Sequence, residues 1–264
     1  MNTSSFELFG IRLDALSNRG LVDIVSRELE NPGLSIIGNH NLHSLYLWFH
    51  DLRVQEFYRL NKYTHIDGMS LVLLGRLFGL PLKREHRATY VDLLPLLAAE
   101  AARRQWRIFY LGSRPGVGEK AARILREHYV GLQIATHHGY FDAATASSEN
   151  LAVLAEINDY APDILMVGMG MPRQEVWLLE NHKEIGARAV LCCGAMMDYT
   201  AGEIPSPPRW IGRLGFEWLY RLLSEPARLW GRYLVEPWSV MRNLAGLYLS
   251  SAHLNSRDRV GSNE

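Results

Sequence analysis

A carboxylate at the end of a short apolar segment is the first candidate for chemistry in this sequence. Asp67 follows His65-Ile66 and precedes Gly68. A carboxylate in such a place can take the proton from a sugar hydroxyl, which is a poor nucleophile until it is deprotonated. Asp67 could instead cap the helix that is expected to begin after Gly68, because aspartate is a favoured capping residue. Both interpretations stay open on the sequence alone.

Two glycine-bearing turns offer places for an anion. Residues 112–118 follow an expected strand and open an expected helix, and residues 168–175 repeat this arrangement. Backbone N–H groups at a helix N-terminus bind phosphate, and glycine lets the anion come close. Ligands of open α/β sheets bind at the carboxyl ends of the strands, so two such turns favour a nucleotide site. The alternatives are a plain tight connection for the first turn and, for Glu175, a charge that complements the helix dipole.

The glycine spacing does not fit a dinucleotide enzyme. The first turn lacks the GxGxxG pattern, and the strand expected at residues 132–136 ends without the acidic residue that grips a ribose. NAD is therefore disfavoured. The chain also has no Asp-x-Asp triplet, on which many nucleotide-sugar enzymes hold a divalent metal. Arginine side chains are expected to neutralise a diphosphate instead, so the sequence predicts no cofactor and metal-independent chemistry.

A third group of candidates lies toward the C-terminus. Asp198 follows the strand expected at residues 189–193, where it could face the same cleft or cap a helix. Beyond it, arginine and tryptophan interleave at helical spacing. Arginine clamps phosphate oxygens, while tryptophan and basic amphipathic helices favour membrane surfaces. The plainer alternative is a docking helix with a solvated basic face. These residues are Arg209, Arg213, Arg221, Arg228, Arg232 and Arg242, with Trp210, Trp218, Trp230 and Trp238.

The elements that must position these residues alternate between apolar strands and amphipathic helices. This alternation predicts an α/β fold, a Rossmann-like mostly parallel sheet flanked by helices. Prolines at 205, 207 and 208 mark a boundary. We expect a catalytic core at 1–204, an Arg/Trp-rich helical appendage at 205–250 and a disordered tail at 251–264. Strands are expected at 34–38, 107–111, 132–136, 163–168 and 189–193, and helices at 42–61, 70–78, 93–104, 119–129, 151–160 and 174–182.

Composition narrows the classes of protein further. Hydrophobic residues make up 48% of the 264 residues, and 28 Lys and Arg balance 28 Asp and Glu. A neutral balance disfavours a nucleic-acid binder. The start of the chain has no signal-peptide pattern, and no run of about 18 apolar residues is present, so we expect a cytoplasmic protein that is peripheral on the inner face of the membrane. The adjacent Cys192 and Cys193 are expected to be buried filler in a reducing compartment.

Several motifs in this order resemble those of the WecG/TagA/CpsF family, glycosyltransferase family 26. The resemblance covers about residues 6–242. It implies inverting transfer from a UDP-sugar to a polyprenyl-diphosphate-linked sugar, a Rossmann-like core, and a C-terminal appendage that completes the site at the membrane. The motifs are Asp67-Gly68-Met69, Tyr110-Leu111-Gly112-Ser113, Gly139-Tyr140-Phe141, Gly168-Met169-Gly170-Met171-Pro172-Arg173-Gln174-Glu175, and Glu217-Trp218-Leu219-Tyr220-Arg221 with Glu225-Pro226.

The resemblance also implies roles for individual residues. Asp67 matches the family's proposed base, and Arg87 precedes Thr89 and Asp92 as the family's arginine does. The appendage arginines match candidate diphosphate ligands. Together with the residues chosen above, the predicted substrate-binding set is Asn39, Asn41, Arg87, Gly112, Ser113, Tyr140, Gly168, Gly170, Gln174, Asp198, Arg213, Arg221 and Arg228.

Two positions depart from the family's pattern. Asn39-His40-Asn41 stands where Thr-x-Asn is usual, and Tyr90 stands where glycine is usual. Both are expected at the sugar and acceptor end of the cleft, so they disfavour the common N-acetylmannosamine donor. The form of residues 65–69 resembles the exopolysaccharide branch and is similar to the xanthan glucosyltransferase, which implies UDP-glucose as donor and a glucosyl-diphosphate-polyprenol acceptor.

Other functions remain as alternatives. One is a UDP-N-acetylmannosamine transferase that acts on N-acetylglucosaminyl-diphosphate-undecaprenol. Another is a non-catalytic nucleotide-binding module on the membrane surface, and a third is an oxidoreductase that binds a dinucleotide at the glycine turns. The sequence leaves the oligomeric state open, a homo-oligomer included.

Overall fold

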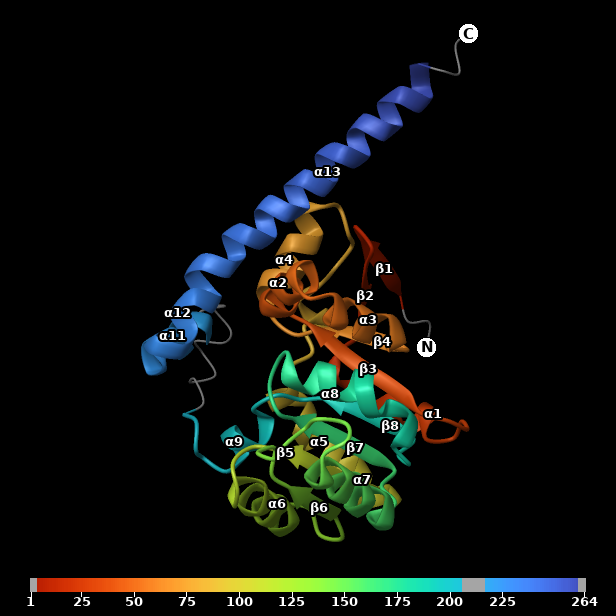
Figure 1. The fold of residues 1–264 in the computed structure, drawn as a ribbon, viewed down its shortest axis with the longest axis vertical. Helices are drawn as coiled ribbons and strands as arrows, with labels where there is room; N and C mark the ends of the chain where they lie inside the picture. Colours follow the sequence, from red (N-terminus) through yellow and green to blue (C-terminus); the bar gives the residue numbers. More distant parts are fainter. Residues whose placement is uncertain (1–3, 206–216, 261–264) are drawn as a thin grey trace.

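A twisted sheet forms the centre of the protein. The computed structural model describes residues 4–205 and 217–260, in which an eight-stranded sheet has the order β1-β2-β4-β3-β8-β7-β5-β6 (Figure 1). The first pair, β1 and β2, is an antiparallel hairpin, and every other neighbouring pair is parallel. The predicted α/β class with a mostly parallel sheet is confirmed. The strands are β1 (Ser5–Leu8), β2 (Ile11–Asp14), β3 (Ser35–His40), β4 (Tyr63–Ile66), β5 (Arg107–Gly112), β6 (Gln133–His137), β7 (Ile164–Gly168) and β8 (Ala189–Cys192).

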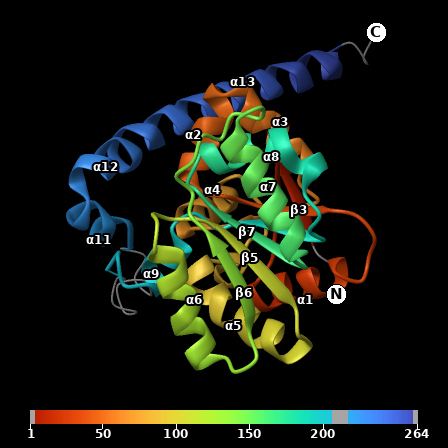
Figure 2. The ribbon, with the colours of Figure 1, turned by 60° about the horizontal axis from the view of Figure 1, so that its bottom comes forward.

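Helices bury both faces of the sheet (Figure 2). One face carries α1 (Asn18–Glu28), α5 (Tyr90–Arg104), α6 (Val117–His128) and α9 (Met196–Thr200), and the other carries α3 (Leu52–Leu60), α7 (Ser148–Tyr160) and α8 (Arg173–Asn181). Along β5, Ile108 and Tyr110 point to the first face, while Phe109 and Leu111 point to the second. Burial on both sides explains why this strand is apolar without alternation.

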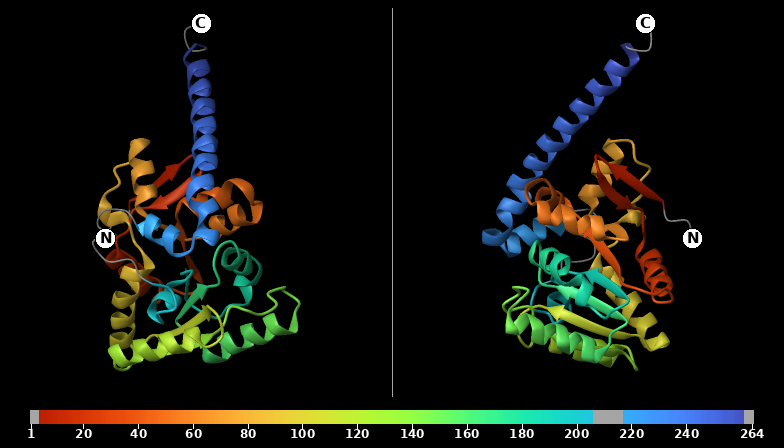
Figure 3. Two further views of the ribbon diagram at one scale, coloured as in Figure 1. Left: turned by 90° about the vertical axis from the view of Figure 1, so that its left-hand side faces the viewer. Right: turned by 45° about the vertical axis from the view of Figure 1, so that its right-hand side comes forward.

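A third apolar cluster joins the two ends of the chain. It combines the β1–β2 hairpin with α2 (Leu42–His50), α4 (Met69–Leu77) and the C-terminal helix α13 (Glu236–Val260). Val240 and Leu244 of α13 are fully buried in it. A hydrogen bond of 2.7 Å between His43 Nδ1 and Glu236 Oε2 fixes the start of α13 on α2. Further along, α13 projects away from the body (Figures 1 and 3).

The remaining C-terminal elements are short. They are α11 (Glu217–Ser224), α12 (Pro226–Trp230) and a π-helical turn, η3 (Gly231–Val235), which leads into α13. From residue 217 onward, the stretch predicted to form a helical appendage is helical. α13 continues to Val260, past the start of the expected disordered tail, and residues 261–264 lie outside the described chain. In residues 4–205 and 217–260, no helix has both the length and the apolar character needed to cross a membrane.

Some predicted elements differ from the observed ones for local reasons. The single helix expected at residues 42–61 is two helices, because Asp51 has an extended backbone (φ −134°, ψ 112°) that ends α2 and begins α3. Its carboxylate accepts a hydrogen bond from the backbone N–H of Arg53, which is a typical capping contact. The hairpin and α1 were not among the expected elements, although Ser17 caps α1 and accepts from the N–H of Gly20.

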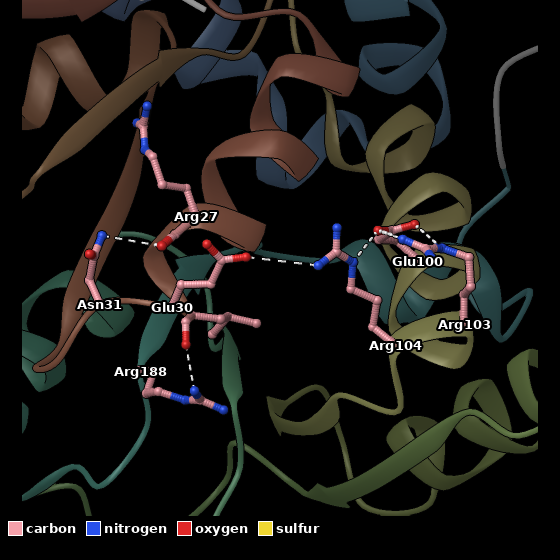
Figure 4. Close-up of polar contacts among 8 residues, drawn as sticks. Arg27, Glu30, Asn31, Glu100, Arg103, Arg104 and Arg188 are labelled. Carbon is pink, nitrogen blue, oxygen red and sulfur yellow. Dashed lines mark hydrogen bonds and ion pairs between the residues drawn. The ribbon is translucent and has the colours of Figure 1, made fainter.

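Polar contacts hold the opposite edge of the sheet, where α1 and α5 end and β8 begins (Figure 4). Arg188 donates to the carbonyl of Leu29, and Arg104 Nη1 lies 3.9 Å from Glu30 Oε1. Arg103 and Arg104 both pair with Glu100. These ion pairs are largely exposed, so they position helix ends and contribute little free energy individually.

Candidate active site

The carboxyl ends of five neighbouring strands line one edge of the sheet. In the order β4-β3-β8-β7-β5, this edge holds Asp67, Asn39, Gly194, Gly168 and Gly112. Neighbouring strands lie about 4.8 Å apart, so Asp67 and Gly112 are separated by roughly 19 Å. This distance suits an extended ligand with different chemical groups at its two ends.

The glycine turns approach one another backbone to backbone. A Cβ atom on Gly112 would lie 2.5 Å from the carbonyl carbon of Gly168. A Cβ atom on Gly168 would lie 2.4 Å from the Tyr110 hydroxyl and 2.5 Å from the carbonyl oxygen of Gly194. Larger residues therefore do not fit at these two strand ends. The structure brings the predicted Gly112, Gly168 and Gly170 together, and Gly170 has a positive φ of 81°.

Gln174 fixes the shape of these turns. Its side chain is buried, and Oε1 accepts hydrogen bonds of 3.3 Å from the backbone N–H groups of Gly170 and Gly194. Its Nε2 donates to Glu175 Oε1 at 2.8 Å. The side chain thus ties the β7–α8 turn to the β8–α9 turn, and in this structure its polar atoms are used within the protein.

Ser113 and Asp198 meet beside the first turn. Ser113 Oγ donates to Asp198 Oδ2 at 2.7 Å and lies 2.6 Å from the Tyr110 hydroxyl. Ser113 has a φ of +57°, which directs it out of the regular strand. The residue that caps α9 is Ala195, so Asp198 does not hold the capping position that was an alternative on the sequence. The two predicted residues form one polar group beside Gly112 at this end of the edge.

Asp67 lies at the other end of the edge. Asn39 Nδ2 donates to Asp67 Oδ2 at 3.4 Å, and the Asp67 backbone N–H donates to the carbonyl of His40. Gly68, with a φ of +121°, is the capping residue of α4, so Asp67 does not hold that position. Arg87 forms a parallel bridge with Ile66, which places it next to Asp67. Asn39, Asp67 and Arg87 therefore converge as predicted.

Two of the remaining predicted residues have other surroundings. Asn41 caps α2, since its side chain accepts a hydrogen bond of 3.0 Å from the backbone N–H of Ser44. Tyr140 lies on the loop after β6 with 63% of its side chain exposed. No contact in the described chain draws either side chain to Asp67 or to the glycine turns.

The appendage arginines are placed in part. The guanidinium carbon of Arg221 lies 5.1 Å from the ring centroid of Tyr199, so α11 contacts the core at α9. Arg228 lies in α12, and its side chain is outside the described structure. Arg213 falls among residues 206–216, which are also outside it.

Tyr90, the second departure from the family's pattern, is buried beside this end of the edge. Its hydroxyl lies 3.4 Å from His65 Nε2. Burial raises the pKa of Tyr90 well above its ordinary value, and the charge of Asp67 acts in the same direction. The effect of Tyr90 on the choice of donor sugar stays a prediction.

Two residues outside the predicted set interact with residues of this edge. Glu175 is buried at the start of α8, and burial raises its pKa to about 7 against the opposing effects of Gln174 and Arg232. Arg232 comes from η3 and is close enough for its charge to interact with those of Asp67 and Glu175. Spacing offered a signal for Arg232, because it follows Arg221 and Arg228 on one helical face.

The described residues contain no group of three or more His, Cys, Asp or Glu side chains arranged to hold a metal ion. Among the same residues, Cys192 and Cys193 are free and buried, as expected. Metal independence stays a prediction, which a chelator can test.

Comparison with known proteins identifies the family of this chain. The model of the Glycosyl transferase WecG/TagA/CpsF family matches residues 6–253. Proteins from Staphylococcus aureus strains MRSA252 and MW2, both named N-acetylglucosaminyldiphosphoundecaprenol N-acetyl-β-D-mannosaminyltransferase, are 25% identical over 238 residues. The match covers 86% of this chain and 88% of each relative. The chain therefore belongs to the WecG/TagA/CpsF family of glycosyltransferases and is an enzyme that transfers a sugar.

Proposed function

We propose that the enzyme transfers N-acetylmannosamine from its UDP derivative to N-acetylglucosaminyl-diphosphate-polyprenol. The observation that carries this proposal is the shared sheet edge, where the glycine turns and the Asp67 carboxylate follow the carboxyl ends of parallel strands. The names of the S. aureus relatives support this donor and acceptor over the UDP-glucose and glucosyl acceptor expected from the sequence.

In the proposed reaction, Asp67 takes the proton of the acceptor hydroxyl as its oxygen attacks the anomeric carbon of the donor. The bond from that carbon to the UDP oxygen breaks on the opposite face, so the configuration inverts. The turns at residues 112–118 and 168–174 bind the nucleotide and its phosphates. Negative charge develops on the departing diphosphate, and Arg213, Arg221 and Arg228 are proposed to stabilise it.

A substrate panel tests this function. UDP release is measured for UDP-N-acetylmannosamine, UDP-glucose and UDP-N-acetylglucosamine with N-acetylglucosaminyl- and glucosyl-diphosphate lipids, with and without EDTA. We expect turnover with UDP-N-acetylmannosamine on the N-acetylglucosaminyl lipid, unchanged by EDTA. Turnover confined to UDP-glucose on the glucosyl lipid would restore the exopolysaccharide interpretation. UDP binding without any turnover would indicate a non-catalytic module, and loss of turnover in EDTA would refute metal independence.

The appendage is proposed to rest on the inner face of the cytoplasmic membrane, where a polyprenyl tail would be anchored. Trp218, Trp230 and Trp238 are 42%, 58% and 76% exposed, and Leu223 and Leu234 are also exposed. Tryptophan on an exposed basic helix is typical of proteins that lie at a lipid interface.

Replacing Trp230 and Trp238 by serine should weaken binding to anionic phosphatidylglycerol vesicles by about 10–100-fold. The reason is that burying a large apolar side chain contributes about 1.5–3 kcal/mol. Vesicle flotation measures the effect, and Leu151→Ser, which changes a 56% exposed side chain on α7, is the matched control. Equal flotation of the wild type and the double variant would rule out this surface as the contact.

A further inference from the structure

Arg232 is held in place from both sides along the chain. Leu229, three residues before it, is buried, and Glu236, one helical turn after it, is bonded to His43 in the first turn of α2. Because α2 begins directly after β3, these anchors place η3 over the carboxyl end of β3. Asp67 follows the neighbouring strand β4 on one side, and α8 with Glu175 lies toward β8 and β7 on the other.

The surroundings of Arg232 are charged. Its guanidinium is half-buried and interacts electrostatically with Asp67, Glu236, Tyr233 and Arg221. The positive charge of Arg221 repels that of Arg232. Two guanidinium groups that converge at a phosphate-binding edge match the charge and the hydrogen-bonding geometry of a diphosphate.

Glu175 is a buried carboxyl group whose charge interacts with that of Arg232. Its Oε1 accepts from Gln174 Nε2 at 2.8 Å, while its Oε2 is buried without a hydrogen-bond partner in the described residues. The titratable groups that act on it are Arg232 from η3, Tyr58 from α3 and Cys192 from β8. Of these three side chains, Arg232 carries the positive charge. An unpartnered buried carboxylate needs a nearby positive charge, and the appendage supplies it.

We propose that Arg232 binds the diphosphate group of a substrate and that Glu175 is the positioning residue that holds Arg232 over the sheet edge. This inference rests on the proposed function for the identity of the diphosphate, which belongs either to the UDP-sugar or to the lipid-linked acceptor. Glu175 acts through Arg232 and touches neither substrate. The core and the appendage thus contribute one residue each to a single binding element.

The ionisation of Glu175 gives this pair a distinct pH dependence. Burial raises the pKa of Glu175 to about 7, above its ordinary value of 4.5. The charged form that attracts Arg232 therefore becomes dominant only above pH 7. Since the folded-state pKa is the higher one, ionising Glu175 costs stability as the pH rises from 4.5 through 7. Glu175→Gln should accordingly unfold at a higher temperature than the wild type at pH 8 and at a similar temperature at pH 4.5.

The test measures the Kd of UDP for the full chain by calorimetry at pH 6 and pH 8. We expect Arg232→Gln to weaken UDP binding by about 10–100-fold, the value of hydrogen bonds to a charged group, with partial recovery in Arg232→Lys. Arg59→Gln removes the same charge from an exposed position on α3 and should bind as the wild type does. Thermal unfolding of each variant shows that it is folded.

Glu175→Gln should weaken UDP binding relative to the wild type more at pH 8 than at pH 6, even though its thermal stability at pH 8 rises. Glu180→Gln, an exposed change on the same helix, is its control. If Glu175 has a purely structural role, the Glu175→Gln variant should bind UDP with the wild-type affinity at both pH values. That result for Glu175→Gln would overturn its assignment as the residue that positions Arg232.

The two sources of diphosphate are separated by kinetics. If Arg232→Gln leaves the Kd of UDP unchanged but raises the KM of the lipid-diphosphate acceptor, Arg232 serves the acceptor. If both stay at wild-type values, the inference is wrong while the proposed function stands. Conversely, if the wild type binds UDP but transfers no sugar, the proposed function fails, and the Kd of UDP for Arg232→Gln still decides the inference.

Discussion

Asp67→Asn should lower turnover by about 10²–10⁴-fold, the usual contribution of a general base. Asparagine has the same shape, and its amide oxygen can still accept the hydrogen bond from Asn39 Nδ2 that reaches Asp67 Oδ2 in the structure. It cannot take a proton from the acceptor hydroxyl. The binding of UDP should be preserved, because the glycine turns lie at the far end of the sheet edge. Single-turnover sugar transfer, calorimetric UDP binding and thermal unfolding measure the three effects separately.

The control for this variant is Asp159→Asn, an exposed change on α7 that removes the same charge. It should turn over as the wild type does. If Asp67→Asn also keeps full activity, Asp67 is not the base, and the acceptor proton must leave by another route. If Asp67→Asn unfolds at a much lower temperature, the carboxylate matters for folding, and a kinetic interpretation would need the variant measured well below that temperature.

Gly112→Ala should lower both the stability of the protein and its turnover, because it displaces the turn at residues 112–118. The added Cβ atom would stand 2.5 Å from both the carbonyl carbon and the carbonyl oxygen of Gly168. Backbone atoms of a neighbouring central strand cannot rotate away, so β5 and β7 must separate. Overpacking of this kind costs about 3 kcal/mol, which corresponds to a Tm lower by roughly 6–12 °C. Displacement of the turns by about 1 Å should lower turnover about 10²-fold.

Gly246→Ala is the matched control, because a Cβ atom there meets nothing within 4 Å. Gly246 lies inside α13, where alanine is expected to stabilise the helix by about 0.5–1 kcal/mol. Scanning calorimetry and UDP titration of both variants give the comparison. A Gly112→Ala protein with wild-type Tm and UDP affinity would show that β5 and β7 separate easily, and the tight contact would then have no role in the site.

The parts of the site that follow strands could be predicted from the sequence. An apolar run followed by a glycine turn and a helix specifies a strand end, and parallel strands bring their ends to one edge, so Asp67, Ser113 and Asp198 were all placed correctly at that edge. The hydrogen bond between Ser113 and Asp198 was not predicted, because it depends on the strand order β8-β7-β5. Strand order is a long-range property that local periodicity does not contain.

The residues that the sequence did not assign are those whose role depends on another segment. In the sequence, Glu175 resembles any acidic residue in the first turn of a helix. It is a buried carboxyl group only because α3, β8 and η3 pack around it. The burial of Tyr90 against His65 is likewise a tertiary contact, which the sequence alone does not show. The break at Asp51 and the four-residue strands of the hairpin were missed because they are shorter than the window over which periodicity is meaningful.

The burial of Val240 and Leu244 against α2, α4 and the hairpin also affects how the chain folds. The pair His43 and Glu236 closes a loop of 193 residues, and Phe9 packs edge to face on Tyr248. Contacts of such high sequence separation form slowly, because loop closure must precede the packing that rewards it. During synthesis, the half of the sheet that holds Asp67 therefore cannot complete its core until α13 has left the ribosome. The end of the sheet edge that holds Asp67 would therefore be completed last, after the end that holds Gly112 has already folded.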